Sequence, residues 1–321
     1  MCCHLPASQL AVAKGNAMSN RWWTYQKERF PLVAHGPLIA AFSSSAVCFS
    51  ALLRGSVRLP AAGSLLVAFL TAIIFFVQLR IADEFKDFED DSRYRPYRPV
   101  PRGLVQLSEL GWIGAAGALI QLLLALLLHL ALGWILLGVW IYLSLMSKEF
   151  FVAHWIKRRP ITYLWTHMLI MPLIDFYATA CDWAPTQSWL PRGLFWFLII
   201  SFFNGTVVEI GRKIRAPEDE ETGVSTYTAL WGRPRAIFTW LGALLASATI
   251  ACLAAREIHF LLPVRALLVS LWTLAACLGW QFLRKHTSQA AHRIEAFSGV
   301  WTLCLYLCLG VVPLLIQTLC H

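Results

Sequence analysis

The most concentrated chemical potential in the sequence lies in residues 80–103, where a row of acids is followed by a row of arginines. The acids are Asp83, Glu84, Asp87, Glu89, Asp90 and Asp91, and the arginines are Arg93, Arg95, Arg98 and Arg102. On a helix, Asp83, Asp87 and Asp91 would share one face, with Glu84 beside it. Such a stack repels itself unless it holds a cation, and Mg²⁺ accepts one or two carboxylates together with waters and phosphate oxygens. A solvated charged loop is the alternative interpretation. We expect these four acids to be the metal-binding and catalytic carboxylates.

A second charged cluster begins at Glu209, with Arg212 and Lys213 three and four residues further on. Pro217 is expected to break that helix, and four acids follow it, at Glu218, Asp219, Glu220 and Glu221. Each cluster comes directly after a long apolar run. Two carboxylate clusters that face each other across a cavity could hold two or more Mg²⁺ ions.

The basic residues near both clusters predict a phosphate ligand, because Arg contacts phosphate through two donors and Lys as a point charge. The candidates are Arg80, Arg98, Lys157, Arg158, Arg212, Lys213 and Arg215. The run at 157–159 is equally typical of an ordinary basic flank of a membrane helix. A diphosphate at the surface and a hydrocarbon tail within the membrane together describe an isoprenyl diphosphate. A dry cavity would protect its allylic cation from water.

These clusters must be positioned by membrane helices. Hydrophobic residues make up 58% of the 321 residues, charged residues only 14%, and the mean hydropathy is +0.60. Nine apolar stretches approach the ~20 residues that cross a bilayer. They lie at about 31–53, 60–81, 107–128, 131–147, 161–181, 193–211, 236–254, 260–281 and 298–318. We therefore expect an all-α polytopic membrane protein with two four-helix pseudo-repeats around a central cavity. Residues 1–29 would form an arm, and residues 30–321 a single domain.

The basic residues also predict the orientation. The arm and four of the connections between apolar stretches carry 22 of the 27 Lys and Arg. These connections are residues 80–103, 148–159, 212–235 and 284–293. Because basic residues favour the cytoplasmic side, this places the N-terminus and both acidic clusters in the cytoplasm. The net charge of +9 is then a topology signal and an attraction to anionic lipid, and it does not indicate nucleic-acid binding. The expected location is the cell membrane, or the inner membrane of a bacterium.

The first cluster resembles a motif of the UbiA superfamily of intramembrane prenyltransferases, N-D-x-x-D-x-x-x-D followed by Arg-Pro and Gly. Residues 83–91, DEFKDFEDD, stand in its place, with Arg98-Pro99 and Gly103 behind them. The loop RYRPYRPVPRG looks similar to that of the chlorophyll-synthase branch. Lys157-Arg158 resembles the family's Lys-Arg after the fourth helix.

The second cluster resembles the family's D-x-x-x-D-x-x-x-G motif. Counting back from Gly223, Asp219 matches the second Asp, while Arg215 occupies the place of the first. Glu209 would then supply the missing ligand, so that Glu209 and Asp219 join the metal ligands. Arg215 would contact diphosphate oxygens, or else pair with Asp219 one turn away.

The resemblance implies nine transmembrane helices, Mg²⁺ as cofactor and an isoprenyl diphosphate as substrate. The prenyl group would pass to an aromatic or other lipophilic acceptor. A UbiA-like terpene cyclase, in which the chain's own double bonds attack the cation, is the alternative, and its cavity would use aromatic side chains. A transporter built from two related halves is a third interpretation.

Overall fold

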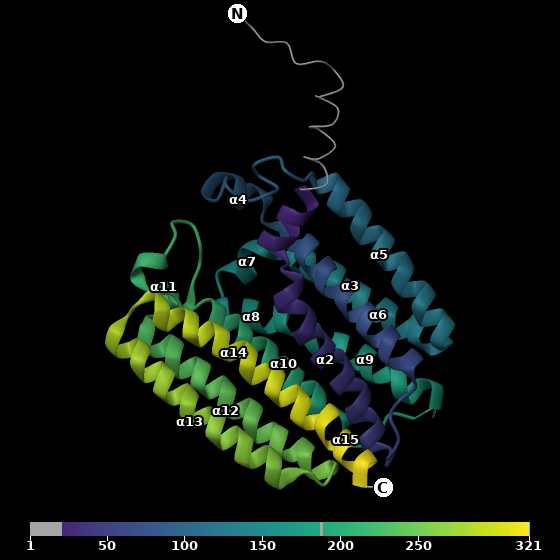
Figure 1. Cartoon of the computed structure of the whole chain (residues 1–321). Coiled ribbons are helices and arrows are strands. Elements are labelled where there is room, and N and C mark those ends of the chain that lie inside the picture. The colour runs from purple at the N-terminus through teal and green to yellow at the C-terminus, as the bar shows by residue number, and fades with distance from the viewer. Residues whose placement is uncertain (1–20, 187–188, 321) are drawn as a thin grey trace, which may run out of the picture.

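The computed structural model describes residues 21–186 and 189–320, so residues 1–20 of the predicted arm lie outside the described part. Every regular element in the described part is helical (Figure 1). Eight helical spans are long and apolar enough to cross a membrane. They are α2 (Leu32–Leu53), α3 (Ala62–Lys86), α5 (Leu107–Leu128), α6 (Leu130–Ser147), α10 (Leu194–Arg212), α12 (Arg233–Glu257), α13 (Leu261–Lys285), and α14 (Ser288–Leu309) continued by α15 (Val311–Cys320). The predicted all-α polytopic membrane fold is confirmed.

The remaining predicted segment, 161–181, is present as two shorter helices, α8 (Pro160–Met168) and α9 (Ile170–Thr186). They separate at Leu169, three residues before Pro172. Proline cannot donate to the carbonyl of Met168, and its ring crowds that carbonyl, which interrupts the helix there. Together α8 and α9 occupy the position of the remaining predicted segment, and α9 packs against α2, α3, α6 and α10 in the interior.

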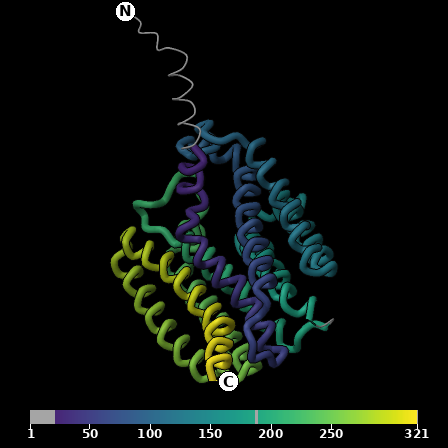
Figure 2. Tube along the Cα trace, turned by 45° about the vertical axis from the view of Figure 1, so that its right-hand side comes forward, coloured from purple at the N-terminus to yellow at the C-terminus, as the bar shows by residue number. Residues whose placement is uncertain are grey.

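The bundle has two groups of helices, which meet through α2 and through the packing of α9 on α10 (Figure 2). One group packs α3 on α5, α5 on α6 and α6 on α9, and the other packs α10 on α12, α12 on α13 and α13 on α14. Its interior holds large aromatic side chains such as Trp240 and Trp301, whereas Leu127 and Trp134 on the outside are 83% and 75% exposed. A bundle that is apolar both in its interior and on its outer surface suits a membrane, where the outside contacts lipid tails rather than water.

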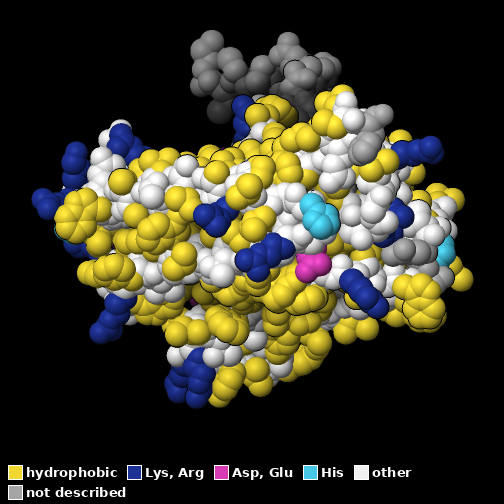
Figure 3. All heavy atoms as spheres, turned by 90° about the horizontal axis from the view of Figure 1, so that it is seen from below, with side chains coloured by type: hydrophobic (Ala, Val, Ile, Leu, Met, Phe, Trp, Pro, Cys, Tyr) yellow, Lys and Arg dark blue, Asp and Glu magenta, His cyan; other side chains and the backbone are white. Residues whose placement is uncertain are grey.

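Both charged clusters lie at the same end of the bundle, opposite the C-terminal helix α15 (Figure 1). Short elements form this end: α4 (Phe88–Tyr94), η1 (Glu149–Phe151), α7 (Ala153–Lys157), η2 (Pro217–Asp219) and α11 (Tyr227–Trp231). Seen from the other end, the surface is mostly hydrophobic with scattered basic side chains (Figure 3). The first cluster follows the second helix of the first predicted repeat, α3, and the second follows the corresponding helix α10.

Candidate active site

The helix that carries the first cluster changes direction within it. Helix α3 ends at Lys86, Asp87 adopts φ −96° and ψ 6°, and α4 begins at Phe88. Backbone bonds from Asp87 to Asp83 and from Asp91 to Asp87, at 2.9 and 2.7 Å, keep the helical spacing across the junction. The predicted row of acids is therefore bent at its centre, and its members meet different partners.

Two of the predicted metal ligands are buried against arginines. One carboxylate oxygen of Asp91 lies 2.7 Å from the guanidinium of Arg95, and the other lies 2.6 Å from that of Arg98. Glu84 is paired with the guanidinium of Arg29. The side chains of Asp91 and Glu84 are only 2% and 1% exposed. Both carboxylates have their charge balanced by residues of the chain itself.

Arg29 ends a helix at residues 21–29 that lies across the first cluster. Within this helix Arg21 pairs with Glu109 at the start of α5 at 2.7 Å, and Glu28 pairs with Arg102 at 2.9 Å. Part of the predicted arm is thus folded onto the loop of the first cluster.

Asp83 and Asp87 form the more accessible part of the first cluster. Asp83 is 39% exposed and lies 3.7 Å from Arg80, three residues before it, and 3.5 Å from Lys86. No ion pair joins Asp87 to any residue that the structure describes. Its pKa is raised by burial, although Lys86 opposes that shift, and the neighbouring acids Asp83 and Asp91 add to it. A bound cation would relieve the cost of ionising Asp87.

The second cluster is organised by Glu209, which is buried near the end of α10. One of its carboxylate oxygens pairs with the guanidinium of Arg212 at 2.6 Å, and the other pairs with the ammonium of Lys213 at 2.8 Å. Arg215 pairs with Glu295 of α14 at 3.5 Å rather than with Asp219. Asp219 keeps one buried carboxylate oxygen with no hydrogen-bond partner among the described residues. Asp219 is therefore more open to a metal than Glu209.

The loops of the two clusters contact each other. Gly223, at φ +80°, lies against the Tyr94 ring so closely that a Cβ there would come within 2.6 Å of it. The Tyr97 hydroxyl donates to Glu221 at 3.2 Å. Glu220 accepts hydrogen bonds from Thr226 and Thr228 at 2.7 Å, which closes the second loop on itself. A glycine is required at 223 both for its backbone angle and for this contact.

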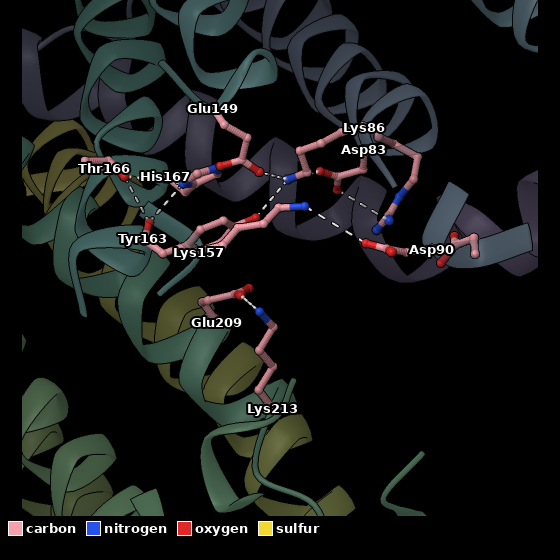
Figure 4. A network of polar contacts seen from close by, with 12 residues as sticks. Asp83, Lys86, Asp90, Glu149, Lys157, Tyr163, Thr166, His167, Glu209 and Lys213 are labelled. Carbon is pink, nitrogen blue, oxygen red and sulfur yellow. Dashed lines mark hydrogen bonds and ion pairs between the residues drawn. The ribbon is translucent and has the colours of Figure 1, made fainter. Parts of the chain in front are cut away.

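Tyr163 of α8 lies where the clusters converge (Figure 4). Lys86 of the first cluster donates to its hydroxyl at 2.9 Å, and Lys213 of the second lies 5.8 Å from the centre of its ring. The ring stacks on His167, with 3.9 Å between centres. Segments 77 residues apart in sequence thus meet at one side chain.

Glu149 completes this group from the connection after α6. Its carboxylate lies 3.7 Å from Lys86 and 3.6 Å from His167, and it is buried, which raises its pKa. Glu149, Phe150 and Phe151 all have positive φ, at 50°, 52° and 59°. Left-handed backbone at three successive residues with side chains is costly and is concentrated at functional sites.

Sequence reasoning did not assign Lys86, Glu149, Tyr163 or His167 to the site. Lys86 lies inside the acidic motif, and this position in the sequence could have assigned it to the site. The other three are brought there by the tertiary fold. Of the remaining candidates, Lys157 lies 4.0 Å from Asp90 on the exposed surface, and Arg158 is exposed beside it.

The sequence matches the UbiA prenyltransferase family over residues 43–301. The chain belongs to this family. No curated protein sequence matches it significantly. The expected superfamily is thereby confirmed, and the UbiA chain is an integral, multi-pass membrane protein.

Solved structures share the fold at low sequence identity. A UbiA homologue from Aeropyrum pernix K1, in its apo form, is 13% identical with a TM-score of 0.66, covering 88% of this chain and 98% of its own. A structure of digeranylgeranylglyceryl phosphate synthase is 15% identical with a TM-score of 0.60, covering 92% and 99%. A UbiA homologue from Archaeoglobus fulgidus bound to DMAPP and Mg²⁺ is 12% identical with a TM-score of 0.53, covering 88% and 98%.

This UbiA chain has fewer carboxylates available to a metal ion than the number of acids in its two clusters suggests. Within residues 21–186 and 189–320, no three His, Cys, Asp or Glu side chains converge as a ready metal site. Asp83 and Asp87 nevertheless offer oxygen ligands one helical turn apart, and Asp87 is half-buried with no ion-pair partner in that part. One or two carboxylates with water and phosphate oxygens suffice for Mg²⁺.

Proposed function

We propose that this UbiA chain is a Mg²⁺-dependent intramembrane prenyltransferase that ionises an isoprenyl diphosphate and transfers the prenyl group to an aromatic or other lipophilic acceptor. The observation that carries the proposal is the convergence of acids and cations from both clusters around Tyr163, at one end of an apolar bundle. The A. fulgidus UbiA homologues solved with Mg²⁺ and DMAPP or GPP support this choice of substrate and metal.

The polar groups divide into metal ligands and phosphate ligands. Asp83 and Asp87 are the best-placed residues for Mg²⁺, and Asp219 could add a ligand from the second cluster. When bound, Mg²⁺ would neutralise the charge that develops on the leaving diphosphate. Arg212 and Lys213, held in place by Glu209, are the phosphate ligands of the second cluster.

An apolar surface for the prenyl tail is available within the membrane-spanning part. A groove of about 700 Å³ lies between α2, α3, α14 and α15. Its walls include Pro37, Ala40, Leu65, Phe69 and Leu303, with almost no polar surface. None of its lining residues belongs to the charged clusters, so we assign the groove to the distal part of a long hydrocarbon chain.

The acceptor decides between transfer and cyclisation. In transfer, the C1–O bond of the donor breaks, the diphosphate leaves, and an acceptor atom bonds to C1 and loses its proton. A cyclase would form the new bond within the prenyl chain. The fold similarity to digeranylgeranylglyceryl phosphate synthase supports a lipophilic acceptor. We place the site on the cytoplasmic side of the cell or inner membrane, from the charge asymmetry of the loops.

The test uses purified full-length protein in lipid nanodiscs with Mg²⁺ and geranyl, farnesyl or geranylgeranyl diphosphate. Diphosphate release and products would be measured with and without phenolic and glycerophosphate acceptors. We expect release that depends on an acceptor and a prenylated product. A cyclic hydrocarbon formed without acceptor would identify a cyclase instead. Absence of release under every condition, matching a control with Asp83 and Asp87 both changed to Asn, would contradict the enzyme assignment.

A further inference from the structure

We propose that the Lys86 ammonium is a built-in cation of the diphosphate site and takes the place of one divalent metal ion. The site would then bind a single Mg²⁺ together with the substrate, instead of the two or more that its acids suggest. This inference rests on the proposed function, because it assigns Lys86 to the same diphosphate.

The position of Lys86 is the first argument. Its side chain is 11% exposed, and its ammonium lies between acids of two different segments, 3.5 Å from Asp83 and 3.7 Å from Glu149 (Figure 4). A lysine at an exposed helix end would extend into water. This one is held inside the acidic cluster, where a metal ion would otherwise be needed to separate the carboxylates.

The donors of Lys86 are the second argument. An ammonium has three N–H donors. The Tyr163 hydroxyl accepts one of them at 2.9 Å, whereas the two carboxylates lie at distances that attract the charge without a short hydrogen bond. Donors therefore remain available for phosphate oxygens, while Tyr163 and Glu149 keep the ammonium in the site.

The charge balance is the third argument. Five carboxylates of the site are paired with cations of the chain, and they are Asp83, Glu84, Asp91, Glu149 and Glu209. Their partners are seven, namely Arg29, Arg80, Lys86, Arg95, Arg98, Arg212 and Lys213. Counting Asp87 as well, six negative charges face seven positive ones before any metal binds. Several divalent ions would meet repulsion here, whereas one ion at Asp83 and Asp87 uses the one of these six acids that has no ion-pair partner in the described part.

The backbone near Glu149 is the fourth argument. Three successive residues with positive φ are strained, yet they place the Glu149 carboxylate against Lys86. Both oxygens of Glu149 are buried and have no hydrogen-bond partner among the described residues. Its strained position and its burial are therefore explained by the task of holding the Lys86 charge in the site.

The test counts bound metal. Mn²⁺ would replace Mg²⁺, and ions bound per chain would be measured by electron paramagnetic resonance on the full-length protein in nanodiscs. The ligand would be farnesyl thiodiphosphate, in which sulfur replaces the oxygen that joins C1 to the diphosphate. This replacement slows ionisation of the bond to C1. We expect one Mn²⁺ per wild-type chain. Lys86→Met should weaken analogue binding about tenfold at low Mn²⁺, the range for a lost charged hydrogen bond. At high Mn²⁺ it should bind a second ion and recover affinity.

Two variants complete the experiment. Lys86→Arg keeps the charge and should keep one ion per chain, and Lys148→Met, an exposed lysine of the next loop, is the matched control. Two ions per wild-type chain would overturn the role of Lys86, and this measurement does not depend on whether a variant folds. Unchanged analogue affinity in a folded Lys86→Met protein would overturn it as well. If the wild type binds no analogue at any Mn²⁺ concentration, the proposed function fails, and the inference fails with it.

Discussion

The buried pairing of Asp91 predicts that Asp91→Asn damages the fold rather than metal binding. The substitution keeps the shape of the side chain and removes the charge that balances Arg95 and Arg98. Removing one partner of a buried ion pair costs about 3–5 kcal/mol. Because the two arginines are still 15% and 21% exposed, water can partly compensate them, and we expect the lower end, about 3 kcal/mol. For a chain of this length, this corresponds to a fall in melting temperature of roughly 4–5 °C.

The assay is the thermal loss of monodisperse protein in detergent, followed by fluorescence-detected size exclusion, with Mn²⁺ affinity measured on the same samples. The control is Asp90→Asn. Asp90 is 60% exposed, and its 4.0 Å pair with Lys157 belongs to a class that contributes only about 0–1 kcal/mol. Asp91→Asn should melt earlier and bind Mn²⁺ with unchanged affinity at low temperature. Wild-type stability combined with lost Mn²⁺ affinity would refute the structural role and make Asp91 a metal ligand.

Three further results are expected. Asp87→Asn should lower Mn²⁺ affinity without loss of melting temperature, since the half-buried acid has no ion pair to lose. Glu89→Ala should leave both quantities unchanged because that acid is exposed. Equal Mn²⁺ affinities in these two variants would remove Asp87 from the metal site. Gly223→Ala should reduce prenyl-diphosphate turnover strongly, because its Cβ has no room and its φ is positive, and wild-type turnover would show that the two loops need not touch. Single cysteines at Gly103 and Arg192 should be labelled from opposite sides of the membrane, Gly103 from the cytoplasm, and labelling of Gly103 from outside would reverse the orientation.

Much of the fold could be predicted from local sequence, because lipid requires long apolar helices and charged loops end them. The nine apolar stretches and the charged segments at 80–103 and 209–221 that follow two of them are such signals. The break near Leu169 was also within reach, since Pro172 interrupts a helix by a known steric rule. That break matters because it separates α8, which carries Tyr163, from the deeper helix α9.

The pairing of the site could not be predicted in the same way. The sequence pattern predicted the acids on one straight helix, but the helix changes direction at Asp87. Asp91 therefore pairs with Arg95 and Arg98. Arg29 reaches Glu84 across 55 residues of sequence, and no periodicity predicts such a contact. The sequence identified which residues carry charge, while the tertiary fold decides which of those charges remain available to a ligand.

The helix at residues 21–29 has a practical consequence for anyone who expresses this protein. Hydropathy places the domain boundary at residue 30, and a shortened chain beginning there would keep all its membrane helices and still insert. It would lose Arg29, so the carboxylate of Glu84 would stay buried without its counter-charge, and Arg102 would lose Glu28. Screens that score only yield or membrane insertion would accept such a chain. Purification tags and truncations should therefore end before residue 21.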